Sequence, residues 1–213
     1  MDFMRTVPDG YFDLANVDPP YFHGPNKSGY FGKGYSSLGV KRAKHYDSLD
    51  SWEVPDAEYF AELKRISKNQ IIWGANHFAG VFDSSSSCYL IWDKDNGESS
   101  FADCEIAYTS FNTAARMFRY RWQGMLQGRI GNKRLQEIRI HPTQKPTKLY
   151  EYCLLNYAKA GQRIFDSHLG SGSHAIAANN LGFEITACEK DKSMFDKSCE
   201  WIAQELKQER LFA

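Results

Sequence analysis

The fold is decided by the stretch RIFDSHLGSGSHAIAANNLGFEITACEK, residues 163–190. Its start, Arg163–Ser167, is a predicted strand, and a glycine-bearing turn leads from it into a predicted helix over Ser173–Leu181. Gly182 is suited to stopping that helix, and Phe183–Cys188 is a second predicted strand. A strand, a helix and a strand in this order predict an α/β protein with a mostly parallel sheet.

The turn within this stretch, Asp166 to Gly172, has the chemistry of a ligand site. Its glycines allow a ligand to approach the backbone, and the start of the following helix offers N–H groups to an anion such as a carboxylate. Packing alone explains such a turn equally well. Glu189, at the tip of the next strand, is placed to receive ribose hydroxyls or to cap the last helix. The turn lacks the third glycine of the dinucleotide fingerprint, so a nucleoside bearing a carboxylate fits better.

A second site is predicted near the start of the chain, where the apolar run Phe12–Asp18 reads as a buried strand. It ends in Asp18-Pro19-Pro20-Tyr21. Two successive prolines fix φ and leave carbonyls as the only backbone hydrogen-bonding groups, which makes a rigid corner. The carboxylate of Asp18 can accept hydrogen bonds from an amine, and Tyr21 can stack on a flat ring.

The remaining pattern completes one α/β domain. Asp56 is a predicted cap for a helix with apolar positions at Tyr59, Phe60, Leu63 and Ile66. The other predicted elements are a strand over Gln70–Ala75, an antiparallel pair formed by Ser87–Trp92 and Asp103–Thr109, a helix from Pro146 to a cap at Gly161, a last helix over Asp191–Phe212, and a glycine-rich loop over His23–Gly39.

Charge and cysteine content narrow the class of protein. Formal net charge is zero, but residues 116–148 hold nine Lys or Arg against one acid, Glu137, a local net of +8. This predicts a localised phosphate-binding face, although a solvated charged loop would look the same. The five cysteines are odd in number and widely spaced, which predicts reduced core residues. No apolar run is long enough for a membrane helix, and the start lacks a secretory signal, so we expect a cytoplasmic protein.

Three motifs in this order carry a resemblance to a known family: Asp18-Pro19-Pro20-Tyr21, His141-Pro142-Thr143-Gln144-Lys145-Pro146, and Asp166 to Gly172. The segment Ile72-Trp73-Gly74-Ala75-Asn76-His77 also looks familiar. The chain resembles the S-adenosylmethionine-dependent DNA amino-methyltransferases, in the permuted "beta" order. The resemblance implies a Rossmann-like class I fold with a doubly wound, mostly parallel sheet and an antiparallel strand pair. Only 11 residues precede Phe12, so we expect an internal start or a sheet lacking one N-terminal edge strand.

The resemblance also implies a single methyltransferase domain over residues 1–213 with three regions. These are a catalytic half over about 1–108, a short target-recognition insertion over about 109–140, and a cofactor-binding half over about 141–213. Catalytic roles would fall to Asp18, Pro19, Pro20 and Tyr21. Cofactor-binding roles would fall to Thr143, Gln144, Lys145, Pro146, Asp166, His168, Leu169, Gly170, Ser171, Gly172, Ser173 and Glu189. DNA-binding roles would fall to Arg116, Arg119, Arg121, Arg129, Lys133 and Arg134. His168 and His174 depart from the family pattern, which has an aromatic and a small hydroxyl there; we expect no metal site.

The implied activity is methyl transfer from S-adenosylmethionine to the exocyclic amine of a flipped base in double-stranded DNA. Adenine N6 is favoured because Asp rather than Ser leads the Pro-Pro-Tyr motif. Cytosine N4 remains an alternative, RNA or protein amide methylation ranks lower, and a catalytically idle DNA-binding or scaffolding subunit is the alternative outside the enzyme class. A homodimer and a restriction endonuclease partner, as in restriction-modification, are open expectations.

Overall fold

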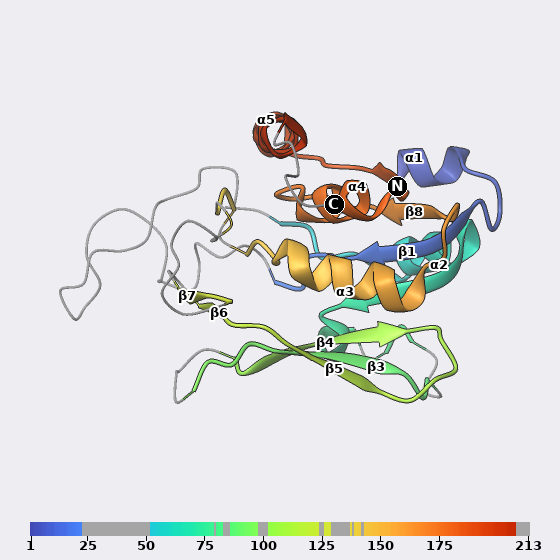
Figure 1. The fold of residues 1–213 in the computed structure, drawn as a ribbon. Helices are drawn as coiled ribbons and strands as arrows, with labels where there is room; N and C mark the ends of the chain where they lie inside the picture. The colour runs from blue at the N-terminus through green and yellow to red at the C-terminus, as the bar shows by residue number, and fades with distance from the viewer. Residues whose placement is uncertain are drawn as a thin grey trace.

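The computed structural model describes residues 1–22, 52–78, 80–82, 86–97, 102–123, 126–128, 137, 139–141 and 143–207. Most of the described chain forms one seven-stranded sheet with helices on both faces (Figure 1). The strand order is β5-β3-β4-β2-β1-β8-β9. Its strands are β1 Phe12–Val17, β2 Ser67–Trp73, β3 Tyr89–Asp93, β4 Cys104–Thr109, β5 Arg116–Arg119, β8 Arg163–Asp166 and β9 Glu184–Ala187. The predicted α/β class is confirmed.

Strand direction brings distant residues to one edge of the sheet. Strand β4 pairs antiparallel with β2 and with β3, as predicted for the β3–β4 pair, whereas β1–β2, β1–β8, β8–β9 and β3–β5 are parallel pairs. The carboxyl ends of the parallel strands and the amino end of β4 therefore meet at the same edge. Asp18, Asp166 and Glu105 are brought to this edge by three different strands.

Two hydrophobic clusters explain the layered arrangement. Helices α1 (Asp2–Thr6) and α2 (Ala57–Ile66) share a cluster with Ala15 of β1, while α3 (Thr147–Tyr157) and α4 (Ser173–Leu181) share the other with Leu14. Because successive side chains of a strand point to opposite faces, the helices cover both faces of β1 (Figure 1). Helix α5 (Lys192–Lys207) packs beside α4. The small elements are η3 (Ala75–His77) and the hairpin of β6 (Trp122–Gln123) and β7 (Leu126–Gln127).

Local signals set most element boundaries. The Asp56 carboxylate accepts a hydrogen bond from the Tyr59 N–H and caps α2, and Gly182 ends α4 with a φ of 72°, both as predicted. The predicted cap at Gly161 is wrong, because α3 ends at Tyr157 and Gly161 lies in the turn before β8 with a φ of 80°. Strand β2 begins at Ser67, earlier than predicted, since α2 passes into it without a loop.

Four further expectations concern the cysteines, the edge of the sheet, membrane helices and the glycine-rich loop. All five cysteines are free, but Cys104 and Cys199 are exposed, so the prediction that all five lie in the core is wrong. The expectation of a missing edge strand concerns the side of the sheet where β9 lies. Within the described ranges β9 is the outermost strand on that side, and the element before β1 is the helix α1. No helix among the described residues is both long and apolar enough to cross a membrane. The predicted loop over 23–39 lies outside the described residues.

Candidate methylation site

Asp18 comes directly after β1, and the two oxygens of its carboxylate lie in different surroundings. Oδ2 lies 2.6 Å from the ammonium nitrogen of Lys145. Oδ1 is buried and has no hydrogen-bond partner among the described residues. A buried acceptor is costly to leave unpaired, so an unpaired one at the edge of a sheet marks a place where a donor from outside the chain can bind.

Lys145 is held between two carboxylates. Its side chain is 4% exposed, and its ammonium nitrogen lies 2.8 Å from Oε2 of Glu105 as well as 2.6 Å from Asp18. The other oxygen of Glu105, Oε1, lies 2.6 Å from the ammonium nitrogen of Lys94. The same ammonium of Lys145 lies 5.8 Å from the ring centroid of Trp73, within cation–π range. The four charges alternate in sign along the row Lys94, Glu105, Lys145 and Asp18.

Burial and these neighbours set the protonation of the two acids. Burial raises the pKa of Asp18 to about 6; Lys145 opposes the rise and Glu105 adds to it. Burial alone would also raise the pKa of Glu105, but Lys145 and Lys94 outweigh it and bring that pKa to about 2. Glu105 is therefore the firmly ionised partner of Lys145, and Asp18 is the acid that titrates nearer neutrality.

Tyr21 lies at the lip of this corner against the turn that follows β2. Its ring is parallel to that of His77, with 4.2 Å between the ring centroids. Gly74, which has a φ of 74°, is also in contact, since a Cβ there would lie 2.6 Å from Cδ1 of Tyr21. The predicted motif residues Gly74 and His77 thus support the aromatic of the acid corner.

Further aromatic rings continue from Tyr21. Phe22 meets Tyr21 edge-on at 5.2 Å and approaches Trp52 at 5.4 Å. Trp52 in turn stacks on His141 at 5.9 Å. Trp52 was not predicted as a site residue, and the sequence around it carries no motif that would have shown it. Burial lowers the pKa of His141 to about 4, so its imidazole is neutral at pH 7.

The glycine turn after β8 is organised by Asp166. This residue is fully buried, and its Oδ1 accepts a hydrogen bond from the His168 N–H at 2.9 Å while its Oδ2 lies 2.9 Å from Nδ1 of His174. The His174 ring stacks on Tyr150 at 4.4 Å. Both oxygens of Asp166 are engaged inside the protein, so this predicted site residue shapes the turn.

His168 is tied to helix α2. Its Nδ1 lies 2.9 Å from the Ser167 hydroxyl, which lies 2.6 Å from the Tyr59 hydroxyl, and the His168 ring packs edge-on against Tyr59. Burial lowers the pKa of His168 to about 4, which makes it a neutral ring. His168 is thus a packed, uncharged ring at the position where the resemblance implies an aromatic.

The two glycines of the turn differ. A Cβ on Gly172 would lie 2.9 Å from Cδ1 of Ile202, so this glycine permits α5 to pack closely. Among the described residues, a Cβ on Gly170 would meet only the His168 carbonyl oxygen at 3.8 Å, so no described side chain covers this glycine. Its N–H donates to Oε2 of Glu189 at 2.9 Å, which fixes that acid beside the turn. Leu169, Ser171 and Ser173 are buried, and the hydroxyls of the two serines lie 2.9 Å apart.

The residues around Lys145 have separate structural tasks. Thr143 is exposed, and its hydroxyl lies 3.1 Å from Nδ1 of His141. Gln144 is buried, with its side-chain oxygen accepting from the Ile140 N–H and its carbonyl accepting from the Trp122 indole. Pro146 occupies the cap of α3 rather than the predicted first helical position. Of this predicted cofactor-lining group, Lys145 is the one whose side chain reaches the acid corner.

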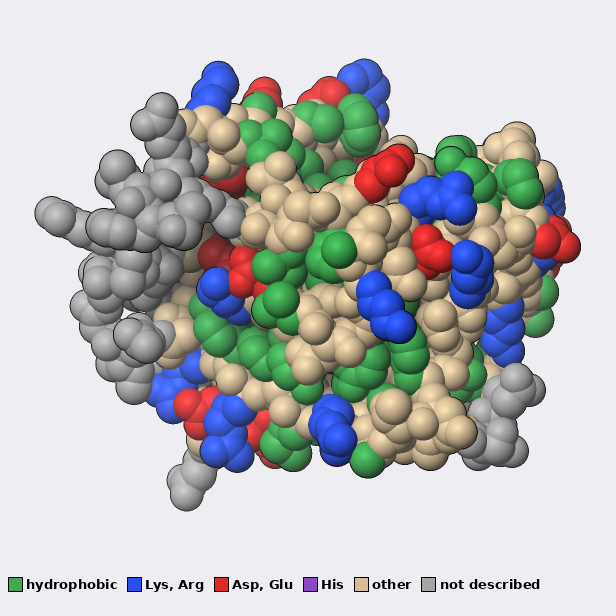
Figure 2. Space-filling view, turned by 45° about the vertical axis from the view of Figure 1, so that its right-hand side comes forward, with side chains coloured by type: hydrophobic (Ala, Val, Ile, Leu, Met, Phe, Trp, Pro, Cys, Tyr) green, Lys and Arg blue, Asp and Glu red, His purple; other side chains and the backbone are tan. Residues whose placement is uncertain are grey.

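The predicted DNA-binding arginines fall into two groups. Arg119 and Arg121 pair with acids at the end of β3 and just after it: Nε of Arg119 lies 2.7 Å from Oδ2 of Asp93, and Nη2 of Arg121 lies 2.6 Å from Oδ2 of Asp95. Arg116 is exposed on β5. On the face in Figure 2, basic and acidic side chains are interspersed. Arg129, Lys133 and Arg134 lie outside the described residues.

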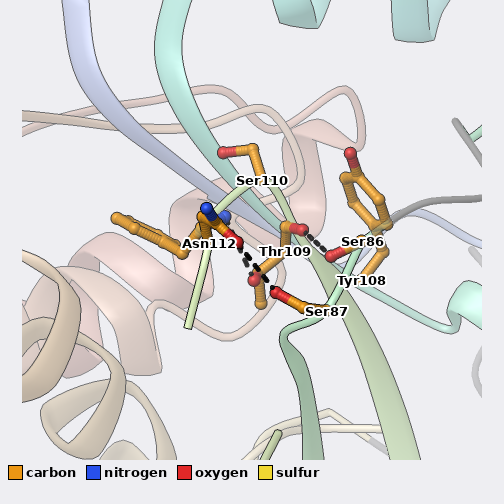
Figure 3. A pocket seen from close by; sticks show the side chains of 7 residues that line it. Ser86, Ser87, Tyr108, Thr109, Ser110 and Asn112 are labelled. Atoms are coloured by element: carbon orange, nitrogen blue, oxygen red, sulfur yellow. Dashed lines mark hydrogen bonds between the residues drawn. The ribbon is translucent and has the colours of Figure 1, made fainter. Parts of the chain in front are cut away.

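A separate pocket of about 190 Å³ lies away from this edge of the sheet. Most of its lining residues are polar and lie at or next to the end of β4, and Ser110 there donates its N–H to the carbonyl of Gln70 within β2. Figure 3 shows the Ser86 hydroxyl bonded to the Thr109 carbonyl at 2.6 Å and the Ser87 hydroxyl bonded to the side-chain oxygen of Asn112 at 3.2 Å. Its polar groups satisfy one another, so we assign no ligand to it.

Comparison with known proteins agrees with this geometry. A protein-family model described as DNA methylase matches residues 33–200. The chain belongs to the DNA methylase family. Type II methyltransferase M2.MboI of Moraxella bovis is 22% identical over 226 residues, which span 93% of this chain and 83% of the relative. Type II methyltransferase M.HinfI of Haemophilus influenzae is 22% identical over 229 residues, spanning 91% of this chain and 63% of the relative.

Solved structures of other methyltransferases share the fold of this methylase. The M1.HpyAVI–SAM complex superposes with a TM-score of 0.53 at 16% identity, covering 93% of this chain and 91% of that one. The PvuII DNA methyltransferase, named as cytosine-N4-specific, gives a TM-score of 0.58 at 12% identity, covering 99% and 84%. The family depends on S-adenosylmethionine, and the predicted Rossmann-like class I fold is confirmed.

The donor and acceptor groups at this edge fit that cofactor. The start of α4 offers backbone N–H groups suited to a carboxylate. Glu189 after β9 accepts from the N–H groups of Gly170 and Asp191, one at each oxygen, and the remaining lone pairs of these oxygens are suited to ribose hydroxyls. Gly170, whose surface is open toward the described residues, comes just before α4 and donates its N–H to Glu189. No group of three or more His, Cys, Asp or Glu side chains in the described part of the chain could hold a metal ion.

Proposed function

We propose that this methylase transfers a methyl group to the exocyclic amine of a flipped DNA base, adenine N6. The observation that carries the proposal is the carboxylate of Asp18, whose Oδ1 is buried without a partner while Oδ2 is held by Lys145. An amine is the kind of donor that this oxygen lacks. The family membership and the neighbouring aromatic of Tyr21 support the same conclusion.

The chemistry follows from the weakness of an exocyclic amine as a nucleophile. Its lone pair is delocalised into the ring, and acceptors that bind its protons localise that pair on nitrogen. Asp18 and the carbonyl of Pro19 act as these acceptors. The negative charge of Asp18 then stabilises the positive charge that develops on nitrogen, in a partly buried place where electrostatic interactions are strong.

The cofactor site is proposed at the glycine turn. Backbone N–H groups at the start of α4 and the carboxylate of Glu189 hold S-adenosylmethionine, with Gly170 allowing close approach. When bound, S-adenosylmethionine supplies an electrophilic methyl group. Asp18 and Asp166 end neighbouring strands, so the base site and the cofactor site adjoin, and proximity can contribute roughly 7–11 kcal/mol in favourable cases.

The target base has to leave the helix to reach Asp18. An amine inside a duplex is inaccessible to a partly buried carboxylate, and enzymes acting on such groups flip the base out. Tyr21 offers an aromatic surface beside Asp18, and base–aromatic stacking is worth about 1–3 kcal/mol. This contribution offsets part of the stacking that the base loses in the duplex.

Adenine is preferred over cytosine because an aspartate leads the Pro-Pro-Tyr motif. Cytosine N4 is the second candidate, because the fold is shared with an enzyme named as cytosine-N4-specific. Transfer of tritiated methyl groups to unmethylated duplex DNA, followed by digestion and identification of the labelled nucleoside, distinguishes the two. We expect N6-methyladenine.

Two variants sharpen this experiment. Asp18→Ala should abolish methyl transfer while S-adenosylmethionine affinity, measured by calorimetry, stays within about twofold. Glu62→Gln is a matched control because it breaks a carboxylate–arginine pair within α2, remote from the Asp18 corner, and should leave transfer unchanged. Label in RNA alone would contradict the proposed substrate, and label in neither nucleic acid would favour an idle DNA-binding subunit.

A further inference from the structure

Glu105 lies outside every motif that identifies the family, yet it contacts the motif residue Lys145. It comes from β4, the antiparallel strand of the sheet, and its Oε2 lies 2.8 Å from the Lys145 ammonium. The side chains of Glu105 and Lys145 are 18% and 4% exposed, so solvent screens their interaction only weakly. A charged side chain buried in this manner needs a partner, and Lys145 has two.

We propose that Glu105 is a positioning residue for methyl transfer: it holds Lys145 where the lysine orients Asp18 without taking up both Asp18 oxygens. The inference rests on the function proposed above. Lys145 contacts Oδ2 of Asp18 alone, and Oδ1 stays unpaired. Because Lys145 is shared with Glu105, its charge is divided between two carboxylates, and Asp18 remains a strong acceptor.

Lys94 completes the arrangement from the far side. Its ammonium lies 2.6 Å from Oε1 of Glu105, so the Glu105 carboxylate is in ion-pair contact with two lysines, the contact of Oε2 with Lys145 lying outside regular hydrogen-bond geometry. Lys94 follows β3, next to β4 in the sheet. The position of Lys145 is thus set by strands outside the Asp18 corner and the glycine turn.

The charges around Asp18 determine how its titration should shift when Glu105 or Lys145 is replaced. Within the part of the chain that the structure describes, the titratable groups that interact with Asp18 besides Lys145 and Glu105 include Asp166 of β8, Tyr21, Tyr59 of α2 and Tyr150 of α3. Removing the Glu105 charge leaves Lys145 to Asp18 alone, which favours ionised Asp18. Removing the Lys145 charge does the reverse. The two variants therefore shift the titration of Asp18 in opposite directions.

The test measures this titration in two ways. The first readout is the acid limb of the pH dependence of kcat/KM, and the second is the 13C resonance of the Asp18 carboxyl, assigned by its absence in Asp18→Asn. In Glu105→Gln both midpoints should fall by about one pH unit, and in Lys145→Met both should rise by a similar amount. Lys145→Arg keeps the charge and should stay near the wild-type midpoint.

A purely structural role for Glu105 predicts a different result. Glu105→Gln would then lower stability and activity with the midpoints unmoved, and this outcome overturns the inference, as does a shift in the same direction in both variants. If the Lys145→Met protein does not fold, the lower pH midpoints expected in Glu105→Gln test the inference by themselves. Glu105→Asp, which keeps the charge on a shorter side chain, should show a smaller fall.

The two readouts separate this inference from the proposed function. If wild-type protein transfers no methyl group to DNA while the Asp18 resonance shifts in opposite directions, the proposed substrate is wrong and the charge arrangement stands. If wild-type protein methylates DNA and neither midpoint moves, the role of Glu105 is wrong and the proposed function stands.

Discussion

The imidazole of His77 lies flat against the phenol ring of Tyr21, with 4.2 Å between centroids and 1° between planes. Two rings at this separation are in direct contact, so no base fits between them. His77 therefore occupies one face of the aromatic proposed to stack on the target. A flipped base has to use the remaining surface of Tyr21 or displace His77.

Two variants of Tyr21 distinguish stacking on its ring from hydrogen bonding to its hydroxyl. We expect Tyr21→Ala to lower kcat/KM about 5-fold to 150-fold, the equivalent of about 1–3 kcal/mol of stacking. Tyr21→Phe retains the ring and should stay within about threefold of wild type. Steady-state methylation of duplex DNA measures both. Equal losses in the two variants would assign the role to the hydroxyl instead.

Gly74 should be sensitive to the addition of one methyl group. Its φ of 74° disfavours any other residue, and the new Cβ would lie 2.6 Å from Cδ1 of Tyr21. We expect Gly74→Ala to lower the free energy of unfolding by about 1–3 kcal/mol, measured by urea denaturation. Gly80→Ala is the control, because a Cβ at Gly80 meets no atom within 4 Å. A loss of the same size in both variants would contradict the steric explanation.

The pH dependence of methyl transfer should report Asp18. The carboxylate has to be ionised to accept from the amine, and burial, its largest influence, raises its pKa to about 6. The rate should therefore increase as the pH rises through about 6 and level off above it. Protonated Asp18 is favoured in the folded state, so the associated stability is present at low pH and is lost as the pH rises through the same value. A kcat/KM profile that is flat between about pH 5 and 8 would exclude Asp18 as the titrating acceptor.

The pair of His174 and Asp166 should matter for stability more than surface ion pairs do. Both side chains are fully buried, and Nδ1 of His174 lies 2.9 Å from Oδ2 of Asp166. His174→Ala leaves that oxygen buried without a partner and removes the stack on Tyr150. We expect a loss of about 3–5 kcal/mol in the free energy of unfolding. Lys192→Ala, which breaks an exposed pair with Asp196, should change it by less than the measurement error.

The pairing of arginines with acids predicts unequal effects on DNA binding. Arg116 is exposed on β5, whereas Arg119 is bound to Asp93. If Arg116 contacts phosphate, Arg116→Ala should weaken binding and reduce the slope of log K against log salt by about one. Arg119→Ala should have a smaller effect, and Asp93→Asn should strengthen binding by releasing Arg119. Fluorescence anisotropy at several salt concentrations measures all three, and stronger binding by Arg116→Ala would contradict a phosphate contact.

Sequence patterns predicted the fold where local chemistry is strong. The cap at Asp56 and the stop at Gly182 each depend on a few neighbouring residues, and both predictions are confirmed. At Gly161 the same reasoning was wrong. A glycine with positive φ also suits the turn that leads into β8, and sequence alone does not separate this use from a helix cap.

Within the candidate site, the motifs indicated which residues meet but not how their charges pair. Asp18 and Lys145 were both singled out, for the base and for the cofactor, and the structure joins them in one ion pair. The sequence did not indicate Glu105 as a site residue, because a single acid in an otherwise apolar strand looks like any solvent-facing position. Its role depends on β4 running antiparallel beside β2, which places its first residues next to Asp18.

The pairing of β1 with β8 has a consequence for how the protein is made. The Asp13 carboxylate accepts a hydrogen bond from the N–H of Arg163, 150 residues later, and Phe12 stacks on Phe165. During synthesis the acid corner leaves the ribosome early, but one flank of its strand stays uncovered until β8 emerges. Such distant pairing slows folding and lengthens the exposure of apolar strand surface. A translation product that stops before Arg163 therefore has β2 on one side of β1 but lacks β8 on the other, so we expect it to be a substrate for chaperones rather than an enzyme.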